Sequence, residues 1–288
     1  MAAIAWIGAG KMGLPVCKRL KDAGHEVRVL GRSPEREAAL EAEGLATAST
    51  VPALINGADI IFTCVSDDTA LADVLLSDGF AASAPSGATL IDMSTVSPSI
   101  SAEVAGKLPA GLAYLRAPVS GSTAMARTGT LTALVSGPEQ AFTAMAPVFA
   151  AFTKKAFHLG TGEEARVLKL VINSLVAATS ALLGEALAVG LKGGLNNEAM
   201  LEVINQSAVA SPLIGYKTAM IAKGEYAPAA TLTMLMKDVE LFLDAGRSTG
   251  VDLPLNSMIG DIYKAAAGRG LGEQDFFVLV REAAARTS

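Results

Sequence analysis

Short apolar runs rich in β-branched residues recur through the first half of the chain, and stretches with helical periodicity separate them. The runs are apolar throughout, which is typical of strands buried on both faces of a parallel sheet. The pattern predicts strands at residues 4–7, 27–30, 60–65, 89–91 and 131–135, and helices at 12–23, 34–43, 69–76, 100–108 and 139–149. We therefore expect an α/β domain in which helices cover both faces of one parallel sheet.

Strand patterns stop near residue 160, and the rest of the chain has helical periodicity. Glycine and proline residues separate helices predicted at 163–192, 197–205, 212–223, 232–249, 255–267 and 274–285. No flexible Gly/Ser tract lies between the two halves, so a long interdomain helix is expected to join them directly. The predicted organisation is an α/β domain over residues 1–162 and an all-α domain over residues 163–288.

Three glycines follow the first predicted strand and open the first predicted helix, in the run Gly8-Ala9-Gly10-Lys11-Met12-Gly13. In this context GxGxxG favours a Rossmann dinucleotide site. The first glycine allows the tight turn, the second lets the backbone approach the pyrophosphate, and the third lets the helix pack on the strand. We expect a doubly wound, dinucleotide-binding domain; a glycine-rich turn without a ligand is the alternative.

The end of the second predicted strand indicates which dinucleotide is bound. An NAD site carries an Asp or Glu about 20 residues after the glycines, whereas this chain reads Gly31-Arg32-Ser33 at that point. A guanidinium can bind a 2′-phosphate through two hydrogen bonds, and Ser33 can add a third. The sequence therefore predicts NADP; the alternative is that Arg32 is a solvated loop cation.

Two more strand ends, Val65-Ser66-Asp67-Asp68 and Asp92-Met93-Ser94-Thr95, are expected to line the nicotinamide side of the cofactor. Ligands of open α/β sheets bind beyond the carboxyl ends of the strands. Asp67 and Asp68 resemble a pair of catalytic carboxylates. However, adjacent acids at the start of a helix are more often capping residues, and we assign them to capping.

Candidates for the reacting end lie further along the chain. Ser120-Gly121-Ser122 offers hydroxyls and backbone N–H groups to a substrate carboxylate, although an ordinary turn has the same composition. Lys169 and Asn173, at i and i+4, share one face of the first helix of the second half. Apolar neighbours favour the neutral form of a lysine, which makes Lys169 a better proton donor. The alternative is a lysine whose stem covers apolar surface. Lys237 lies in another apolar helix and could reach the cofactor, but by itself such a lysine more often belongs to a solvated helix face.

Composition excludes several classes of function. Of 288 residues 51% are hydrophobic and 18% charged, and the net charge of −5 provides no basic field for nucleic acid or a membrane. Cys17 and Cys64 are interpreted as buried thiols, and His25 and His158 lack metal-ligand spacing, so no metal is expected. The apolar stretch at 170–183 is shorter than the ~20 residues of a membrane span. Without a signal-peptide pattern, the expected location is the cytoplasm.

Together these segments resemble the β-hydroxyacid dehydrogenase family, which includes 3-hydroxyisobutyrate dehydrogenases and glyoxylate/succinic semialdehyde reductases. The resemblance covers essentially the whole chain. It rests on the glycine turn, the runs 92–98 and 117–121, Lys169 with Asn173, and Lys237-Asp238. It implies that Lys169 is catalytic and that Asn173 contacts the substrate. It also implies a Rossmann domain followed by a helical domain, and a homodimer or homotetramer packed through the helical part.

The motifs and the resemblance together imply the following site. Lys169 is the catalytic residue; Ser120, Gly121, Ser122 and Asn173 bind the substrate; and Gly8, Ala9, Gly10, Lys11, Met12, Gly13, Arg32, Ser33, Val65, Ser66, Thr95 and Lys237 bind NADP(H).

Some residues depart from the family's pattern. Arg116 stands where an acid is common, Ser122 replaces a frequent glycine, and Ser174 follows Asn173 where a second asparagine is common. Residues 224–228 and Arg32 look more like the semialdehyde-reductase branch. We expect NADP(H)-dependent hydride transfer to or from a small carbonyl or hydroxy acid, such as a semialdehyde, glyoxylate or 3-hydroxyisobutyrate. The alternatives are an enzyme similar to imine reductases, which usually lack the lysine, and a non-catalytic NADP-binding module.

Overall fold

A computed structural model describes residues 1–285, and the chain divides into two compact units, Met1–Lys169 and Leu170–Ser288. The division falls inside the long helix α10 (Glu164–Lys192), whereas the change of sequence pattern at 162/163 precedes this helix. The first residues of α10 belong to the α/β unit because side chains such as Ala165 and Arg166 are buried there. Sequence periodicity shows where a helix begins, but not which core its first turn joins.

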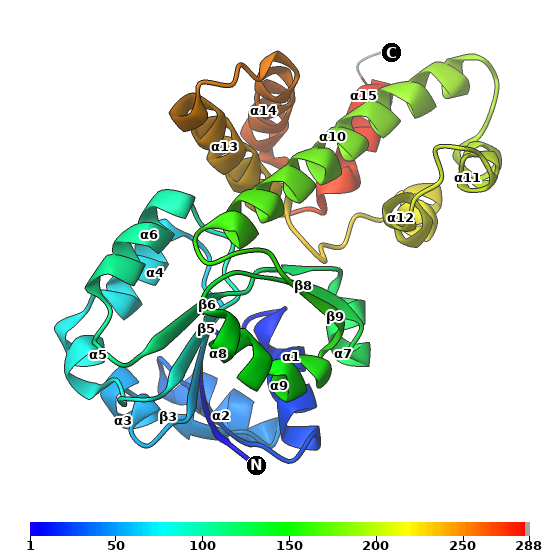
Figure 1. Cartoon of the computed structure of the whole chain (residues 1–288). Coiled ribbons are helices and arrows are strands. Elements are labelled where there is room, and N and C mark those ends of the chain that lie inside the picture. Colours follow the sequence, from blue (N-terminus) through cyan, green and yellow to red (C-terminus); the bar gives the residue numbers. More distant parts are fainter. Residues whose placement is uncertain (286–288) are drawn as a thin grey trace. The chain divides into compact units, whose positions relative to one another are not determined.

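A six-stranded parallel sheet forms the centre of the first unit, with the strand order β3-β2-β1-β4-β5-β6 (Figure 1). Every neighbouring pair in it is parallel. Its strands are β1 (Ala3–Ile7), β2 (Glu26–Leu30), β3 (Ala46–Ala48), β4 (Ile60–Thr63), β5 (Thr89–Asp92) and β6 (Ala113–Arg116). The order reverses between β1 and β4, where ligands of doubly wound sheets bind. The predicted doubly wound α/β fold is thus confirmed.

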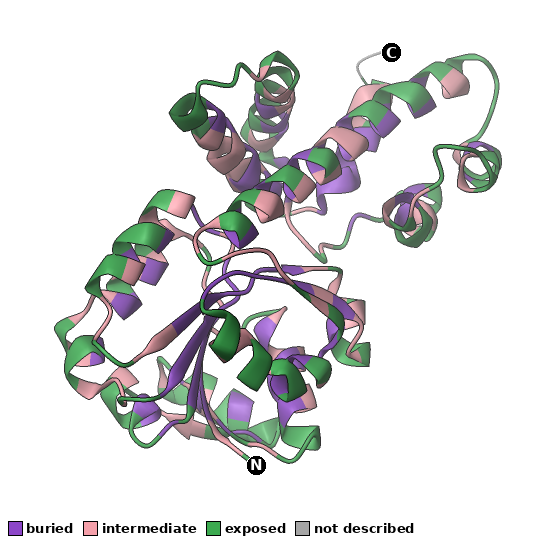
Figure 2. Cartoon of the chain, in the orientation of Figure 1, coloured by how far each residue is buried: buried purple, intermediate pink, exposed green. Residues whose placement is uncertain are grey.

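Helices cover both faces of this sheet, and successive residues of β1 face opposite sides. Trp6 packs in one core, to which α1 and α2 contribute, while Ala5 and Ile7 pack in another, to which α3 to α6 contribute. Figure 2 shows the strands buried almost throughout between helices that are exposed on their outer sides. The helices are α1 (Gly13–Asp22), α2 (Pro34–Ala42), α3 (Val51–Ile55), α4 (Asp68–Leu75), α5 (Asp78–Ser83) and α6 (Pro98–Lys107).

The prediction that residues 131–135 join the parallel sheet is wrong. They form β8 (Leu131–Val135) of a second, three-stranded sheet, antiparallel to β7 (Val119–Ser120) and parallel to β9 (Thr153–His158). Only the short helix α7 (Thr123–Thr128) separates β7 from β8. So short a connection favours antiparallel pairing of the two strands, because a parallel crossover needs a dozen or more residues. The predicted helix 139–149 is two helices, α8 (Glu139–Ala144) and α9 (Ala146–Ala150).

The described residues of the second unit are mostly helical, as predicted, with one isolated β-bridge between Thr231 and Asp275. After α10 follow α11 (Asn197–Gln206), α12 (Pro212–Lys223), α13 (Leu232–Thr249), α14 (Pro254–Ala266), a π-helical turn (Ala267–Leu271), a 3-10 turn (Phe276–Val278) and α15 (Leu279–Ala285). The helix predicted at 274–285 therefore begins later than expected. Asp275 has an extended backbone, and its carboxylate accepts a hydrogen bond from the amide of Phe277, which caps the 3-10 turn instead.

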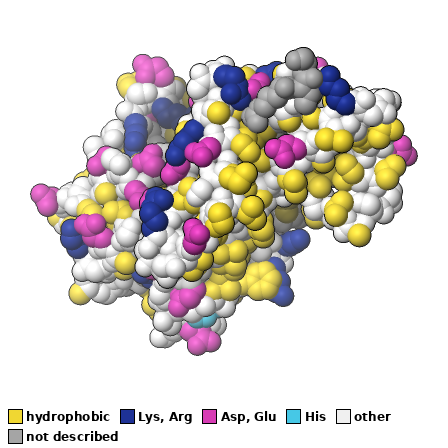
Figure 3. Space-filling view, turned by 90° about the horizontal axis from the view of Figure 1, so that it is seen from above, with side chains coloured by type: hydrophobic (Ala, Val, Ile, Leu, Met, Phe, Trp, Pro, Cys, Tyr) yellow, Lys and Arg dark blue, Asp and Glu magenta, His cyan; other side chains and the backbone are white. Residues whose placement is uncertain are grey.

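Helix α10 is long and apolar enough, by length and composition alone, to cross a membrane, and its most apolar 18-residue window has a mean hydropathy of 1.7. The expectation from the sequence rested on the apolar stretch at 170–183 alone, whereas the whole helix α10 is long and apolar enough to pass this criterion. Ala177, Ala181 and Leu187 belong to the core of the helical unit, so a core helix also accounts for this composition. Leu182 and Val189 of the same helix are exposed. Figure 3 shows that hydrophobic side chains are numerous on one outward face of the molecule.

Candidate active site

The glycine turn between β1 and α1 has the geometry that a bound pyrophosphate requires. Gly8 has a φ of +92°, and a Cβ at this position would overlap the backbone oxygen of Cys64. A Cβ at Gly13 would lie 2.6 Å from the oxygen of Gly8, so α1 can pack on the turn only because residue 13 lacks a side chain. Among the described residues, no atom outside the turn lies within 4 Å of the Cβ position of Gly10. The outer side of the turn is therefore open to a phosphate.

The first turn of α1 offers backbone N–H groups to that phosphate. Within residues 1–285, Met12 at the N-cap position makes no side-chain cap bond, whereas Ser33, Asp67 and Ser97 cap α2, α4 and α6. Uncapped amides and the positive end of a helix dipole attract an anion. The residues of this turn thus fit a dinucleotide.

At the end of β2, Arg32 is exposed and Ser33 starts α2. The Ser33 hydroxyl accepts a hydrogen bond from the amide of Arg36 at 3.3 Å. A hydrogen bond with Ser33 also holds the pKa of Glu35 below its ordinary value. Ser33 therefore has a capping role that the sequence interpretation did not assign. The Arg36 guanidinium, also not anticipated, donates to the backbone oxygen of Ala9 in the glycine turn. A second cation thus lies beside the predicted phosphate site.

The ends of β4 and β5 are joined through Ser94. Its hydroxyl accepts a hydrogen bond from the amide of Val65 at 2.9 Å, and its own amide donates to Asp92 at 3.0 Å. The structure therefore brings the segments of two predicted cofactor residues, Val65 and Thr95, next to each other. The Val65 amide is committed to Ser94, so this residue would meet a cofactor through its other atoms.

Of the two acids after β4, Asp67 has the capping role predicted for it, whereas Asp68 lies in the first turn of α4 and bonds to the start of α6. Asp67 is the N-cap of α4 and accepts a hydrogen bond from the amide of Ala70 at 2.9 Å; the hydroxyl of Ser66 donates to the same carboxylate at 2.6 Å. Asp68 accepts a hydrogen bond from the amide of Ser97 at 2.8 Å. These contacts account for both acids without a catalytic role.

The predicted substrate loop leads from β7 into α7. Ser120 is partly exposed and pairs with Thr132 in the second sheet, and Gly121 is exposed with a φ of +135°. A Cβ on Gly121 would lie 2.8 Å from the Leu131 side chain, and the positive φ strains any residue other than glycine at this position. The Ser122 hydroxyl caps α7 by accepting from the amide of Met125 at 3.3 Å. Ser120 and Gly121 are thus presented outward, whereas Ser122 has a local structural role.

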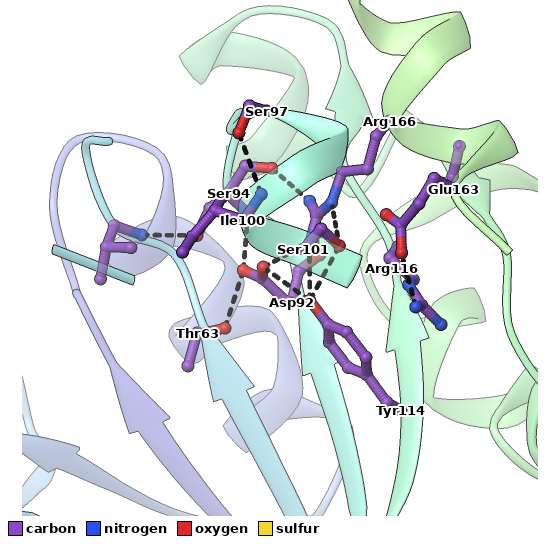
Figure 4. Close-up of polar contacts among 12 residues, drawn as sticks. Thr63, Asp92, Ser94, Ser97, Ile100, Ser101, Tyr114, Arg116, Glu163 and Arg166 are labelled. Carbon is purple, nitrogen blue, oxygen red and sulfur yellow. Dashed lines mark hydrogen bonds and ion pairs between the residues drawn. The ribbon is translucent and has the colours of Figure 1, made fainter. Parts of the chain in front are cut away.

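A buried ion pair binds the first turn of α10 to the carboxyl end of β5 (Figure 4). Arg166 and Asp92 form this pair, with side chains 1% and 0% exposed. The Arg166 guanidinium also donates to the Ser94 oxygen at 2.6 Å, the Tyr114 hydroxyl at 3.1 Å and the Ser101 hydroxyl at 3.2 Å. Burial is the largest single influence and by itself would lower the pKa of Arg166, but Asp92, Tyr114 and Glu163 together outweigh it and raise this pKa, so the guanidinium stays charged.

A second ion pair, which is partly buried, lies beside the first. Arg116 at the end of β6 donates to the Glu163 carboxylate from Nε at 2.9 Å and from Nη2 at 2.5 Å. Its guanidinium also stacks 4.4 Å from the centre of the Tyr114 ring. Arg116, which departs from the family's pattern, thus holds Glu163, the residue just before α10, in place. Lys169, which is partly buried, lies one turn after Arg166 on the same helix.

In the helical unit, Asn173 is buried and one of its amide N–H groups donates to Asp238 at 2.6 Å. The Lys237 ammonium lies 3.2 Å from the other oxygen of Asp238, although not in hydrogen-bonding geometry. The sequence interpretation treated Asn173 and Lys237 as separate ligand contacts. The structure joins them through Asp238, and Asn173 retains a second N–H and an oxygen for a ligand.

Sequence interpretation missed Arg36 and Arg166, and it quoted Asp92 and Asp238 without giving either residue a role of its own. Only Arg166 carried a usable signal, as an arginine among apolar residues one turn before Lys169. No group of three or more His, Cys, Asp or Glu residues within 1–285 is arranged to hold a metal ion. Burial raises the pKa of Cys64 to about 12, so this thiol beside the glycine turn is uncharged at neutral pH.

Comparison with known proteins identifies the class of protein. Residues 3–160 match the model for the NAD binding domain of 6-phosphogluconate dehydrogenase, and residues 162–283 match the NAD-binding model of NADP-dependent 3-hydroxyisobutyrate dehydrogenase. The fold and these matches define an NAD(P)-dependent oxidoreductase acting on a hydroxy acid. More specifically, the chain belongs to the β-hydroxyacid dehydrogenase family.

Individual relatives agree with this assignment. The 2-(hydroxymethyl)glutarate dehydrogenase of Eubacterium barkeri is 33% identical over 282 residues, covering 96% of this chain and 93% of the relative. The crystal structure of 3-hydroxyisobutyrate dehydrogenase from Salmonella typhimurium superposes with a TM-score of 0.89 at 26% identity, over 98% of this chain and 100% of that one. Psf3 in complex with NADP+ and 2-OPP gives a TM-score of 0.87 at 25% identity, over 97% and 99%.

Proposed function

We propose that this enzyme uses NADP(H) to interconvert a small semialdehyde and the corresponding β-hydroxy carboxylate, with Lys169 as the proton donor. The observation that carries the proposal is the anchoring of α10, whose first turn is hydrogen-bonded to the end of β5 through Arg166. This contact keeps Lys169 near the edge of the sheet where ligands of doubly wound folds bind.

The preference for NADP(H) rests on the end of β2. Arg32 is exposed there, and the segment Gly31-Arg32-Ser33 lacks the carboxylate that binds the ribose hydroxyls of NAD. A guanidinium at this position suits a 2′-phosphate, and Arg36 adds a second positive charge. The match of the second half to an NADP-dependent enzyme model supports the same preference.

The substrate class rests on the printed names of two relatives. Both 2-(hydroxymethyl)glutarate and 3-hydroxyisobutyrate are carboxylates with a hydroxymethyl group on the α-carbon. Oxidation of that group gives a semialdehyde. Ser120 and Gly121 offer a hydroxyl and a backbone N–H group at an exposed loop, a donor set that suits the carboxylate of such a substrate.

In the reductive direction, bound NADPH supplies the hydride that reaches the carbonyl carbon. The ammonium of Lys169 donates its proton to the carbonyl oxygen as charge develops there, so the carbonyl becomes an alcohol and the lysine becomes a neutral amine. Asn173 lies four residues after Lys169 on α10 and has one N–H that is not bonded to Asp238, a donor that suits a substrate oxygen. In the oxidative direction the neutral amine of Lys169 takes the proton back from the alcohol.

The experiment is a substrate and coenzyme panel with the purified enzyme. Oxidation of NADPH is followed with methylmalonate semialdehyde, succinic semialdehyde and glyoxylate, and reduction of NADP+ with 3-hydroxyisobutyrate; each is repeated with NADH or NAD+. We expect turnover of methylmalonate semialdehyde above that of succinic semialdehyde and glyoxylate, whose reduction gives a γ-hydroxy and an α-hydroxy acid, and a higher kcat/KM for NADPH than for NADH. Preference for NADH would contradict the coenzyme assignment. NADPH binding without turnover of any substrate would favour a non-catalytic NADP-binding module.

A further inference from the structure

Arg166 precedes Lys169 by three residues on α10, and both belong to the compact unit Met1–Lys169. Residues at i and i+3 are neighbours on a helix surface. Contacts that fix Arg166 therefore also fix the rotation and the axial position of the turn that carries Lys169.

The contacts of Arg166 reach three separate parts of the α/β unit. Its guanidinium bonds to the Asp92 carboxylate and the Ser94 backbone oxygen at the end of β5, to the Tyr114 hydroxyl on β6, and to the Ser101 hydroxyl on α6. Figure 4 shows these groups converging on the guanidinium. Because the guanidinium is planar and its donors have fixed directions, these contacts leave the helix little freedom to rotate or slide.

The same network continues to the predicted cofactor residues. Asp92 accepts a hydrogen bond from the amide of Ser94, and the Ser94 hydroxyl accepts one from the amide of Val65. Thr95 follows Ser94 directly in the chain. One continuous set of hydrogen bonds therefore links the turn that carries Lys169 to the segments expected beside the nicotinamide.

Stability alone does not explain this arrangement. Removing two charges from water costs free energy that their attraction often fails to repay, so a buried ion pair is weak evidence for stability. An apolar pair would fill the same space without the desolvation cost. What an apolar pair lacks is the directional bonding that sets the position of the helix to a fraction of an ångström.

We propose that Arg166 and Asp92 are positioning residues for the hydride-transfer step. They hold the α10 turn of Lys169 in register with the ends of β4 and β5, and neither residue touches the substrate. This inference rests on the proposed function, in which Lys169 donates the proton. A misplacement of about 1 Å can cost about 10²-fold in rate. We therefore expect Arg166→Met to lower kcat by about that factor.

Three measurements separate positioning from a purely structural role. NADPH affinity is measured by energy transfer from Trp6, the only tryptophan in the chain and one that is buried next to the glycine turn. The kinetic isotope effect on kcat is measured with NADPH deuterated at the transferred position. Amide hydrogen exchange is measured over residues 164–172. We expect unchanged NADPH affinity, a larger isotope effect because hydride transfer becomes rate-limiting, and faster exchange in α10.

The matched control is Lys217→Met, which removes the cation of the buried pair Lys217–Asp275 in the helical unit. This control is expected to reduce thermal stability without changing kcat per folded molecule or the isotope effect. Arg166→Lys keeps the charge opposite Asp92 but not the branched set of donors, so it should restore part of kcat. Tyr114→Phe removes one acceptor from Arg166 and is a milder variant, should Arg166→Met fail to fold.

The outcomes are distinguishable. If Lys169→Ala retains the kcat of the wild type, the proposed function is wrong. If Lys169→Ala loses activity while Arg166→Lys and Tyr114→Phe keep both kcat and isotope effect, only the positioning role is wrong. Equal losses of kcat per folded molecule in Arg166→Met and Lys217→Met would also overturn it, since burial alone would then explain the effect.

Discussion

Two buried ion pairs lie in different surroundings of this molecule. Arg166–Asp92 lies at the carboxyl end of the parallel sheet, whereas Lys217–Asp275 lies inside the helical unit, where the Lys217 ammonium is 4.9 Å from the centre of the Phe276 ring. Both pairs are almost completely buried, yet only the first bonds to segments that carry candidate ligand contacts. Burial of charge therefore does not by itself mark a functional position. A functional position is indicated when the pair connects elements that carry candidate ligand contacts, as Arg166–Asp92 connects α10 to the end of β5.

The largest effect expected outside the catalytic lysine itself is on stability. Lys217→Met leaves Asp275 buried without its cation, and breaking such a pair typically costs about 3–5 kcal/mol. Chemical denaturation should therefore show a large loss in the free energy of unfolding, while kcat per folded molecule stays unchanged. If fully folded Lys217→Met had a lower kcat than the wild type, the proposed difference between the two ion pairs would be contradicted.

A change at the end of β2 should act on the coenzyme instead. Charge-assisted hydrogen bonds contribute about 1.5–3 kcal/mol, so Arg32→Ala should weaken NADPH binding by about 10–100-fold. Affinity for NADH should not change, because NADH lacks the 2′-phosphate. Arg247→Ala, at an exposed position of the helical unit, is the surface control. Equal weakening of both coenzymes in Arg32→Ala would contradict the phosphate contact.

The smallest effect concerns a hydroxyl that the sequence assigned to the substrate. Ser122 caps α7, and loss of an N-cap typically costs about 1 kcal/mol. Ser122→Ala should lower the melting temperature slightly and leave KM unchanged, and Ser122→Asp should preserve the cap. A clear rise of KM in Ser122→Ala would restore the substrate role of this hydroxyl.

Local signals explain which parts of the fold were predictable. The bounds of α12 and α13 were predicted as the structure has them, because a serine or threonine cap begins each helix and a glycine with positive φ ends it, at Gly224 and Gly250. β9 was missed because it carries the exposed Lys154 and Lys155. An exposed polar strand has no apolar pattern to detect.

In the candidate site, too, features that are contiguous in sequence were predictable and contacts between distant residues were not. The glycine turn and its strand–turn–helix context were predictable because they are contiguous in sequence, within residues 4–23. The Arg166–Asp92 pair joins residues 74 positions apart, and Asn173–Asp238 joins residues 65 apart. Neither pair has a spacing rule, since the packing of separate elements brings its members together. The cap at Ser33 was predictable, because the helix expected at 34–43 begins directly after it, whereas the cap at Ser122 was not, because no helix was expected at 123–128.

The most direct test of the central claim is single-turnover oxidation of enzyme-bound NADPH by the best semialdehyde in Lys169→Ala, with and without added methylammonium. If Lys169 donates the proton, the rate should fall by about 10²–10⁴-fold while NADPH affinity, measured through Trp6, stays the same. Methylammonium should then restore part of the rate by replacing the missing ammonium. A rate close to that of the wild type without the added amine would contradict the account.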